Sequence, residues 1–137
     1  MTQTEVDPQL IEDHYPLQQH IGFKMTGWAQ DYARFELPLE PFLMNRYGIP
    51  HGGVYAVLLD TVMGYCGCYT GDPEKKTLAM TLSMTTNFLS RPTGRLLIGE
   101  ASRVGGGKRT FFAEAHICDE NGTRVATGSG TFRYRSA

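Results

Sequence analysis

The chain has 137 residues, of which 20% are charged and 41% hydrophobic, and its formal net charge is -1. This length predicts a single domain, residues 1–137, with a real core. A net charge so close to zero provides no general field for nucleic acid or an anionic membrane, so we expect neither as a partner. The polar N-terminus and the absence of an apolar run near the ~20 residues of a membrane helix predict a cytoplasmic protein.

The three cysteines, Cys66, Cys68 and Cys118, are an odd number. The C-x-C pair has no second pair with which to complete a zinc site. We therefore interpret all three as small apolar residues and expect no metal.

The first elements are predicted from caps and alternation. Asp7 as N-cap and Pro8 at the first helical position predict a short helix that ends near Pro16, within a helical lead-in over residues 1–20. Alternation then predicts two paired strands, at residues 22–29 and 32–37, joined by a turn at Gln30-Asp31.

The rest of the chain predicts one long helix followed by sheet. Residues 54–68 form an apolar helix, and "TGDPEKK" is a polar loop. Four strands are predicted, at residues 77–89, 95–104, 110–118 and 124–133, and Asn121-Gly122 favours a tight hairpin between the last two. The fold class is therefore α+β, with about six mostly antiparallel strands. Because apolar residues occupy much of the circumference of the helix, the sheet must curl around it, or sheet and a partner chain must cover it together.

The long helix carries a stripe of small residues with a carboxylate at its centre: Gly53, Ala56, Asp60, Gly64 and Gly67. An interior glycine costs ~1 kcal/mol relative to alanine, so a close helix contact or a ligand must compensate. Burying Asp60 as an ion costs several kcal/mol unless it is paired. A structural salt bridge to an arginine is the alternative, but we favour a working carboxylate.

The start of this helix, His51-Gly52-Gly53, is a second candidate site. Unsatisfied backbone N–H groups and the positive end of the helix dipole can face an anion or oxyanion there. The alternative is a glycine-rich turn that only bends the chain. His51 could act as a base or ligand, but we favour a structural hydrogen bond to the backbone. Asn45 is equally well explained as a turn former.

Helix geometry separates these two features. Gly52 and Asp60 are eight residues apart, which is ~12 Å along the axis and too far for both to touch one carbonyl carbon. If the helix start polarises a carbonyl, the carboxylate must come from a second copy whose helix runs antiparallel across a two-fold axis. We therefore expect a homodimer.

The segments "NRYGIPHGGVYAVLLDTVMG" and "MTTNFLSRP" resemble the PaaI-type thioesterases of the hotdog fold, which hydrolyse acyl-coenzyme A thioesters. The resemblance extends from about Ile21 to the end of the chain and includes the spacing of Asn45, His51 and Asp60. It implies a hotdog fold, with an antiparallel sheet wrapped around the long helix and active sites shared by two subunits. It further implies homodimers that pair as a dimer of dimers.

The resemblance also implies roles for individual residues. The Gly52 N–H polarises the thioester carbonyl, and Asp60 of the other subunit is the nucleophile or general base. Asn45 positions the water or the carbonyl, and His51 and Gly53 complete the helix start. A hydroxyl on the strand after the helix assists the carboxylate; we place it at Thr81, with Ser83 as its neighbour on the same face. No cofactor is implied beyond the coenzyme A of the substrate.

Basic residues near a glycine-rich turn are candidates for the coenzyme A phosphates. Arg103, Lys108 and Arg109 flank the three glycines of "RVGGGKR", and Arg91 is a second candidate. Ordinary solvated side chains beside a turn are an equally good explanation for any one of them.

Two other functions remain open from the sequence. A hotdog enoyl-CoA hydratase or dehydratase would use His51 and Asp60 together, although the glycines after His51 fit carbonyl polarisation better. A non-catalytic acyl-CoA-binding protein would have little reason to carry Asp60 in an apolar helix. The sequence does not determine the acyl group.

Overall fold

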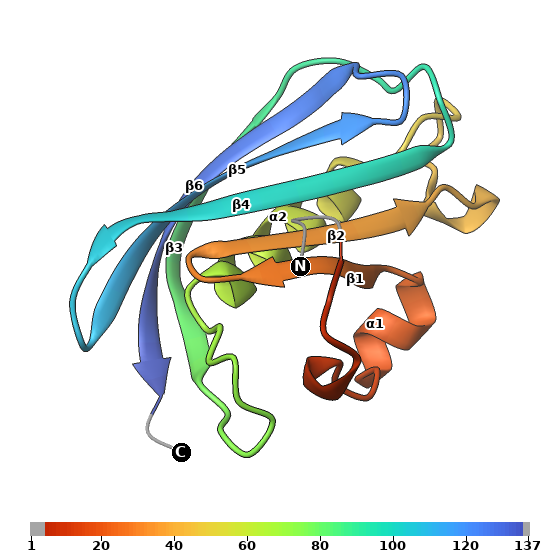
Figure 1. The fold of residues 1–137 in the computed structure, drawn as a ribbon. Coiled ribbons are helices and arrows are strands. Elements are labelled where there is room, and N and C mark those ends of the chain that lie inside the picture. The colour runs from red at the N-terminus through yellow and green to blue at the C-terminus, as the bar shows by residue number, and fades with distance from the viewer. Residues whose placement is uncertain (1–4, 136–137) are drawn as a thin grey trace.

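A computed structural model describes residues 5–135, and Figure 1 shows its arrangement. Two α-helices and six strands follow the chain in the order α1 (Pro16–Ile21), β1 (Lys24–Ala29), β2 (Tyr32–Pro38), α2 (Gly52–Cys66), β3 (Leu78–Phe88), β4 (Leu96–Gly106), β5 (Thr110–Asp119) and β6 (Arg124–Arg135). Two short 3-10 turns, Pro8–Leu10 and Pro41–Leu43, complete the elements.

The strands form one antiparallel sheet in the order β1-β2-β4-β5-β6-β3. The sheet curves around α2, which contacts all six strands (Figure 1). This arrangement confirms the predicted α+β class and the long helix enclosed by a sheet. The two edge strands are β1 and β3, so β3 leaves one row of backbone hydrogen-bonding groups without a neighbouring strand in the described chain.

The core lies between α2 and the concave face of the sheet. Leu58, Leu59, Val62 and Met63 of α2 have no exposed surface, and burying each such side chain contributes roughly 1.5–3 kcal/mol. On β5 the alternation is as predicted, because Phe111, Ala113, Ala115 and Ile117 are buried and the residues between them are more exposed. A Cβ added at Gly99 of β4 would lie 3.1 Å from Leu58, so the absence of a side chain there lets helix and strand approach closely.

The N-terminal prediction is wrong in its details. Asp7 does cap a turn, since its carboxylate accepts from the Gln9 N–H at 3.0 Å, but that turn is a 3-10 turn of three residues. The helix then begins at Pro16 instead of ending there. Proline lacks only an N–H that the first turn leaves unbonded, and its fixed φ suits a helix start. The chain leaves this helix at Gly22, whose φ of 101° is left-handed, so β1 starts later than predicted.

The hairpin between β5 and β6 is confirmed. The Gly122 N–H donates to the Asp119 carbonyl at 3.0 Å, and Gly122 has a φ of 83°. Beneath it the carboxylate of Asp119, only 2% exposed, accepts five hydrogen bonds from the turn and from the loop before β4. The turn is therefore organised around a buried carboxylate.

Two of the cysteines behave as predicted. Cys66 and Cys68 are buried and unpaired, and burial raises the pKa of these thiols to about 12 and about 11. Both stay protonated at neutral pH and act as small apolar side chains. Within residues 5–135 no helix is long and apolar enough to cross a bilayer.

Candidate active site

The start of α2 is capped by its own histidine. His51 is the N-cap, and its Nδ1 accepts a hydrogen bond from the Gly53 N–H at 2.8 Å. An accepting Nδ1 carries no proton, so the neutral ring has its proton on Nε2. His51 therefore has the structural role that we favoured, a hydrogen bond to the backbone. This bond occupies the N–H of Gly53.

The neighbouring N–H of Gly52 is different. Among residues 5–135 it has no hydrogen-bond acceptor, although it stands at the positive end of the 15-residue helix α2. The side of Gly52 that would carry a Cβ faces the ring of Phe88, with 3.4 Å to the nearest carbon. A free, positively polarised donor therefore lies beside the end of β3.

Asn45 shapes the loop before α2. Its Oδ1 accepts from the Tyr47 N–H at 2.9 Å and from the Ile49 N–H at 3.4 Å, which is the turn-forming alternative. The side-chain NH₂ donates no hydrogen bond within the described chain, so it remains free to bind another group.

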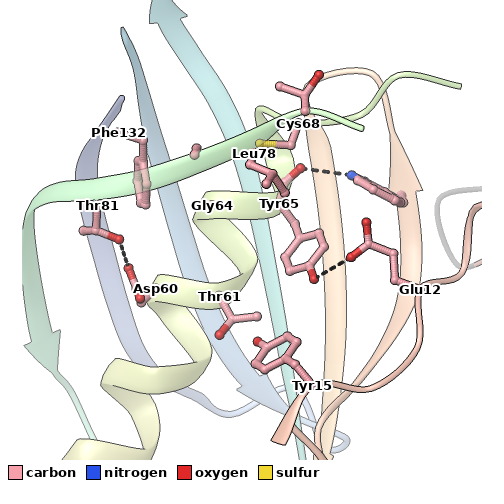
Figure 2. A pocket seen from close by; sticks show the side chains of 13 residues that line it. Glu12, Tyr15, Asp60, Thr61, Gly64, Tyr65, Cys68, Leu78, Thr81 and Phe132 are labelled. Atoms are coloured by element: carbon pink, nitrogen blue, oxygen red, sulfur yellow. Dashed lines mark hydrogen bonds between the residues drawn. The ribbon is translucent and has the colours of Figure 1, made fainter. Parts of the chain in front are cut away.

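Asp60 lies halfway along α2 and faces β3. The Thr81 hydroxyl donates to Asp60 Oδ1 at 2.5 Å, as Figure 2 shows, so the structure brings together the two residues that the resemblance paired. Asp60 remains partly exposed and has no lysine or arginine within 4.0 Å among residues 5–135, so the structural salt bridge is not observed. Its second oxygen is free to react or to bind.

The predicted placement of Ser83 on the same face as Thr81 is wrong. The pairing of β3 with β6 shifts between Thr81 and Ser83, so Leu82 is an extra residue in a β-bulge. A bulge reverses the alternation of the residues that follow it. Accordingly Ala79 packs on the core before the bulge and Met84 after it. Ser83 therefore lies on the opposite face from Thr81 and cannot assist Asp60.

Two glycines of the small-residue stripe, Gly67 and Gly64, have different surroundings. Gly67, which follows α2, packs against Phe111: a Cβ there would lie 2.5 Å from the ring. At Gly64 an added Cβ would meet only Phe132, at 3.9 Å. Contacts among residues 5–135 thus require glycine at position 67 but not at position 64.

A cavity of about 250 Å³ begins at Asp60 and runs beside the second half of α2. Its walls come from α2, β1, β3, β6, the segments that flank α2 and β3, and the stretch before α1 (Figure 2); the lining residues are Glu12, Tyr15, Trp28, Asp60, Thr61, Gly64, Tyr65, Cys68, Thr77, Leu78, Ala79, Thr81 and Phe132. Sequence reasoning missed Glu12 and Tyr15, because no local pattern indicates that this stretch folds back onto α2.

The tyrosines of this cavity are hydrogen-bond donors. Burial raises the pKa of Tyr15 and of Tyr65, so both phenols are protonated at neutral pH. Within residues 5–135 no group of three or more His, Cys, Asp or Glu side chains is arranged to hold a metal ion.

The basic candidates lie at opposite ends of the molecule. Lys108 and Arg109 are exposed at the tip of the β4–β5 hairpin, near the C-terminal end of α2. Arg103 is engaged internally, since its Nη2 donates to the Gly107 carbonyl at 3.1 Å and its Nη1 lies 3.9 Å from Asp31. Arg91 is exposed in the loop after β3, the strand whose last residue, Phe88, lies against the start of α2.

Comparison with known proteins places the chain in a family. Residues 47–126 match the model of the thioesterase superfamily, which is more than half of the chain. A Halobacterium salinarum protein named as a candidate esterase is 29% identical over 132 residues, covering 90% of this chain and 86% of that protein.

Solved structures show the same fold. The Escherichia coli PaaI protein of the phenylacetic acid degradation operon superposes with a TM-score of 0.77 at 19% identity, covering 88% of this chain and 85% of that one. A Bacillus halodurans protein solved with CoA has a TM-score of 0.73 at 26% identity, covering 87% and 75%. The hotdog fold and the PaaI-type resemblance are thereby confirmed: the chain belongs to the thioesterase superfamily.

Proposed function

We propose that the protein hydrolyses an acyl-coenzyme A thioester to the free acid and coenzyme A, at a site shared by two subunits. The observation that carries the proposal is that two polar groups of α2, the Gly52 N–H and the Asp60 carboxylate, have free hydrogen-bonding capacity. The Gly52 N–H has no acceptor, and Asp60 accepts one hydrogen bond, from Thr81, among residues 5–135. Membership of the thioesterase superfamily supports this chemistry.

The two groups must come from different chains. Gly52 and Asp60 are separated by eight residues of the same helix, or ~12 Å along its axis. Gly52 lies beside Phe88, and Asp60 bonds to Thr81, so the two groups lie along different parts of β3. A second copy that pairs its β3 antiparallel across a two-fold axis would bring its Asp60 towards this Gly52.

The edge strand β3 supports such a dimer. It has 11 residues and exposes apolar side chains along its length: Leu78 41%, Met80 49%, Leu82 54% and Phe88 57%. A long edge strand with exposed apolar residues is a site for pairing with another chain. We infer a homodimer through β3, and assembly of two such dimers into a tetramer extends the proposal.

In this site the Gly52 N–H donates to the thioester oxygen and stabilises the negative charge that develops there. Asp60 of the partner subunit either takes a proton from the water that attacks the carbonyl carbon, or attacks that carbon itself and forms a mixed anhydride that a water molecule then hydrolyses. In both cases the carbon–sulfur bond breaks, and the coenzyme A thiolate leaves and takes up a proton. Thr81 orients this carboxylate. Asn45, through its free NH₂, and His51, through Nε2–H, are further donors for the carbonyl or the water.

Coenzyme A as part of the substrate is supported by the Bacillus halodurans neighbour, which was solved with CoA. Exposed Lys108, Arg109 and Arg91 are the candidates for its phosphates, and Arg103 would act by bracing their hairpin. The reaction as proposed needs no metal or further cofactor, and we propose a cytoplasmic location.

An enoyl-CoA hydratase is supported less well. That reaction would use His51 as an acid or base together with Asp60. The Nδ1 of His51 is already bonded to the Gly53 N–H of its own turn, so a proton could not be taken up there without breaking the helix cap.

Complementation between two inactive variants tests the shared site. Gly52→Pro removes the N–H at the first helical position, where proline is tolerated, and the preceding His51, at φ -62° and ψ 138°, has the conformation that proline requires. Asp60→Asn removes the carboxylate. Each variant should be inactive alone against a panel of acyl-CoAs of different chain lengths, with thiol release as the readout.

Heterodimers of the two variants, isolated with two different tags, should recover about half of the wild-type activity, because one of their two sites is intact. Gly52→Ala is the matched control: it places a carbon against Phe88 but keeps the N–H, and it should remain active. Inactive heterodimers of folded chains would show that both groups act within one chain.

A further inference from the structure

The cavity beside Asp60 has chemically different ends. At one end are Asp60 and Thr81, and at the other are Tyr65 and Glu12. Asp60 and Tyr65 are five residues apart on α2, which is ~7.5 Å along the axis. If Asp60 acts on a thioester carbonyl, the cavity of its own chain is where the acyl group extends.

Gly64 keeps this cavity open. It lies on the cavity wall between the two ends, and a methyl group there would touch nothing in the described chain closer than 3.9 Å. Because internal packing does not require the glycine, its effect is to leave space beside the helix. The cavity of about 250 Å³ is far larger than the roughly 10–15 Å³ needed to hold one water molecule, so it has room for a chain of several non-hydrogen atoms.

The far end is polar and has unused capacity. The Tyr65 hydroxyl donates to Glu12 Oε1 at 3.1 Å, and Lys76 Nζ lies 3.6 Å from Oε2 (Figure 2 shows the Tyr65 bond). A carboxylate accepts about four hydrogen bonds, so Glu12 can accept more. Its Lys76 partner is 61% exposed, so the ion pair is too solvated to neutralise the end of the cavity.

An acyl chain that ends in a methyl group would strip water from Glu12 and provide no donor in return. A hydroxyl at the same place would donate to the carboxylate. We infer that Glu12, with Tyr65, forms the far wall of the acyl pocket and selects acyl groups that carry a hydroxyl at the end remote from the thioester. This inference rests on the proposed thioesterase function and adds its substrate class and a specificity residue.

The test compares two thioesters with the same number of non-hydrogen atoms, ω-hydroxyhexanoyl-CoA and heptanoyl-CoA. The wild-type protein should prefer the hydroxylated ester by roughly 10-fold or more in kcat/KM, since a site built to bond a hydroxyl rejects the analogue that lacks it. Glu12→Leu should remove or reverse this preference, mainly by raising kcat/KM for heptanoyl-CoA. Asp13→Leu, at the adjacent exposed carboxylate, is the matched control and should keep the wild-type ratio.

Equal wild-type rates for the two esters would overturn the inference and leave the thioesterase function standing. So would a Glu12→Leu variant that slows both esters by the same factor, because Glu12 would then only tie the N-terminal stretch to α2. Hydrolysis of no acyl-CoA in a broad panel would instead overturn the proposed function and this inference with it.

A second variant approaches the pocket without touching Glu12. Gly64→Ala narrows the cavity and should fold, given the space around position 64. It should lower kcat/KM for ω-hydroxyhexanoyl-CoA by several-fold while leaving acetyl-CoA, which does not reach that far, unchanged. An equal change in kcat/KM for ω-hydroxyhexanoyl-CoA and acetyl-CoA would show that the acyl group does not enter this cavity.

Discussion

Asp60 and Asp119 are carboxylates in the same sheet-and-helix frame, yet their surroundings are opposite. Asp119 is 2% exposed and accepts five hydrogen bonds, which use both of its oxygens. Asp60 is partly exposed and accepts one, from Thr81. A carboxylate whose acceptor sites are filled by its own chain holds that chain together, whereas one with free acceptor sites beside a cavity is available for chemistry.

The hydrogen bonds of Asp119 also determine its protonation. Burial by itself would raise the pKa of Asp119, but the hydrogen bonds from Thr123, Thr93 and Gly94 outweigh burial and hold the pKa well below its ordinary range. Those donors favour the charged form, so Asp119 stays ionised in the folded protein. Substitutions at the two aspartates should therefore separate activity from stability.

The largest effect is expected at Asp60. Asp60→Asn keeps the shape and the Thr81 contact but removes the negative charge, so hydrolysis should fall at least ~100-fold, as for loss of a nucleophile or general base. Thermal unfolding should be nearly unchanged, because the side chain is partly exposed and the asparagine amide oxygen can still accept from Thr81. Full activity in this variant, measured by thiol release, would make Asp60 a structural residue.

A smaller loss of activity is expected at Thr81. Thr81→Val keeps the volume but removes the hydroxyl that bonds Asp60, and hydrogen bonds to charged groups contribute enough for a loss of roughly 10-fold in kcat. Thr81→Ser restores the hydroxyl and should recover most of the rate. If valine and serine behave alike, the hydroxyl does not position the carboxylate.

Asp119→Asn should do the reverse of Asp60→Asn. The amide cannot accept all five hydrogen bonds, and it faces backbone N–H groups of Thr93 and Gly94 with a donor of its own. The melting temperature should fall by several degrees, while kcat/KM per folded molecule stays within about two-fold, as for sites away from the chemistry. A loss of catalysis without a loss of stability would show that Asp119 acts in the chemistry and not in the fold.

The smallest effect is expected in the pH dependence of stability, through the protonation of Asp119. Because its pKa is lowered on folding, the ionised group stabilises the protein above its unfolded pKa of ~3.9, and this contribution is lost as the pH falls towards the folded value. Urea unfolding between about pH 5 and pH 2.5 should therefore show a smaller acid-dependent loss of stability for Asp119→Asn than for the wild type. Parallel curves would show that other carboxylates dominate acid unfolding.

Local patterns in the sequence were sufficient to predict most of the sheet and the long helix. Alternation predicted the six strands to within a few residues, since a residue's face in a strand depends on its neighbours in the chain. The separation of Gly52 and Asp60 was also computable, because helix geometry fixes distances between residues on one helix. Thr81 was found through the resemblance to a family and not from any local pattern.

Contacts between segments that are distant in the sequence determined the other features of the site. The bulge at Leu82 reversed the facing of Ser83, and it depends on how β3 meets β6, which no period in β3 reveals. Glu12 reaches Tyr65 across 53 residues of chain, and only the folded path of the N-terminal stretch brings them together. The sequence thus determined which groups were available for chemistry, and the tertiary structure determined which of them meet, because periodicity acts along the chain while packing acts across it.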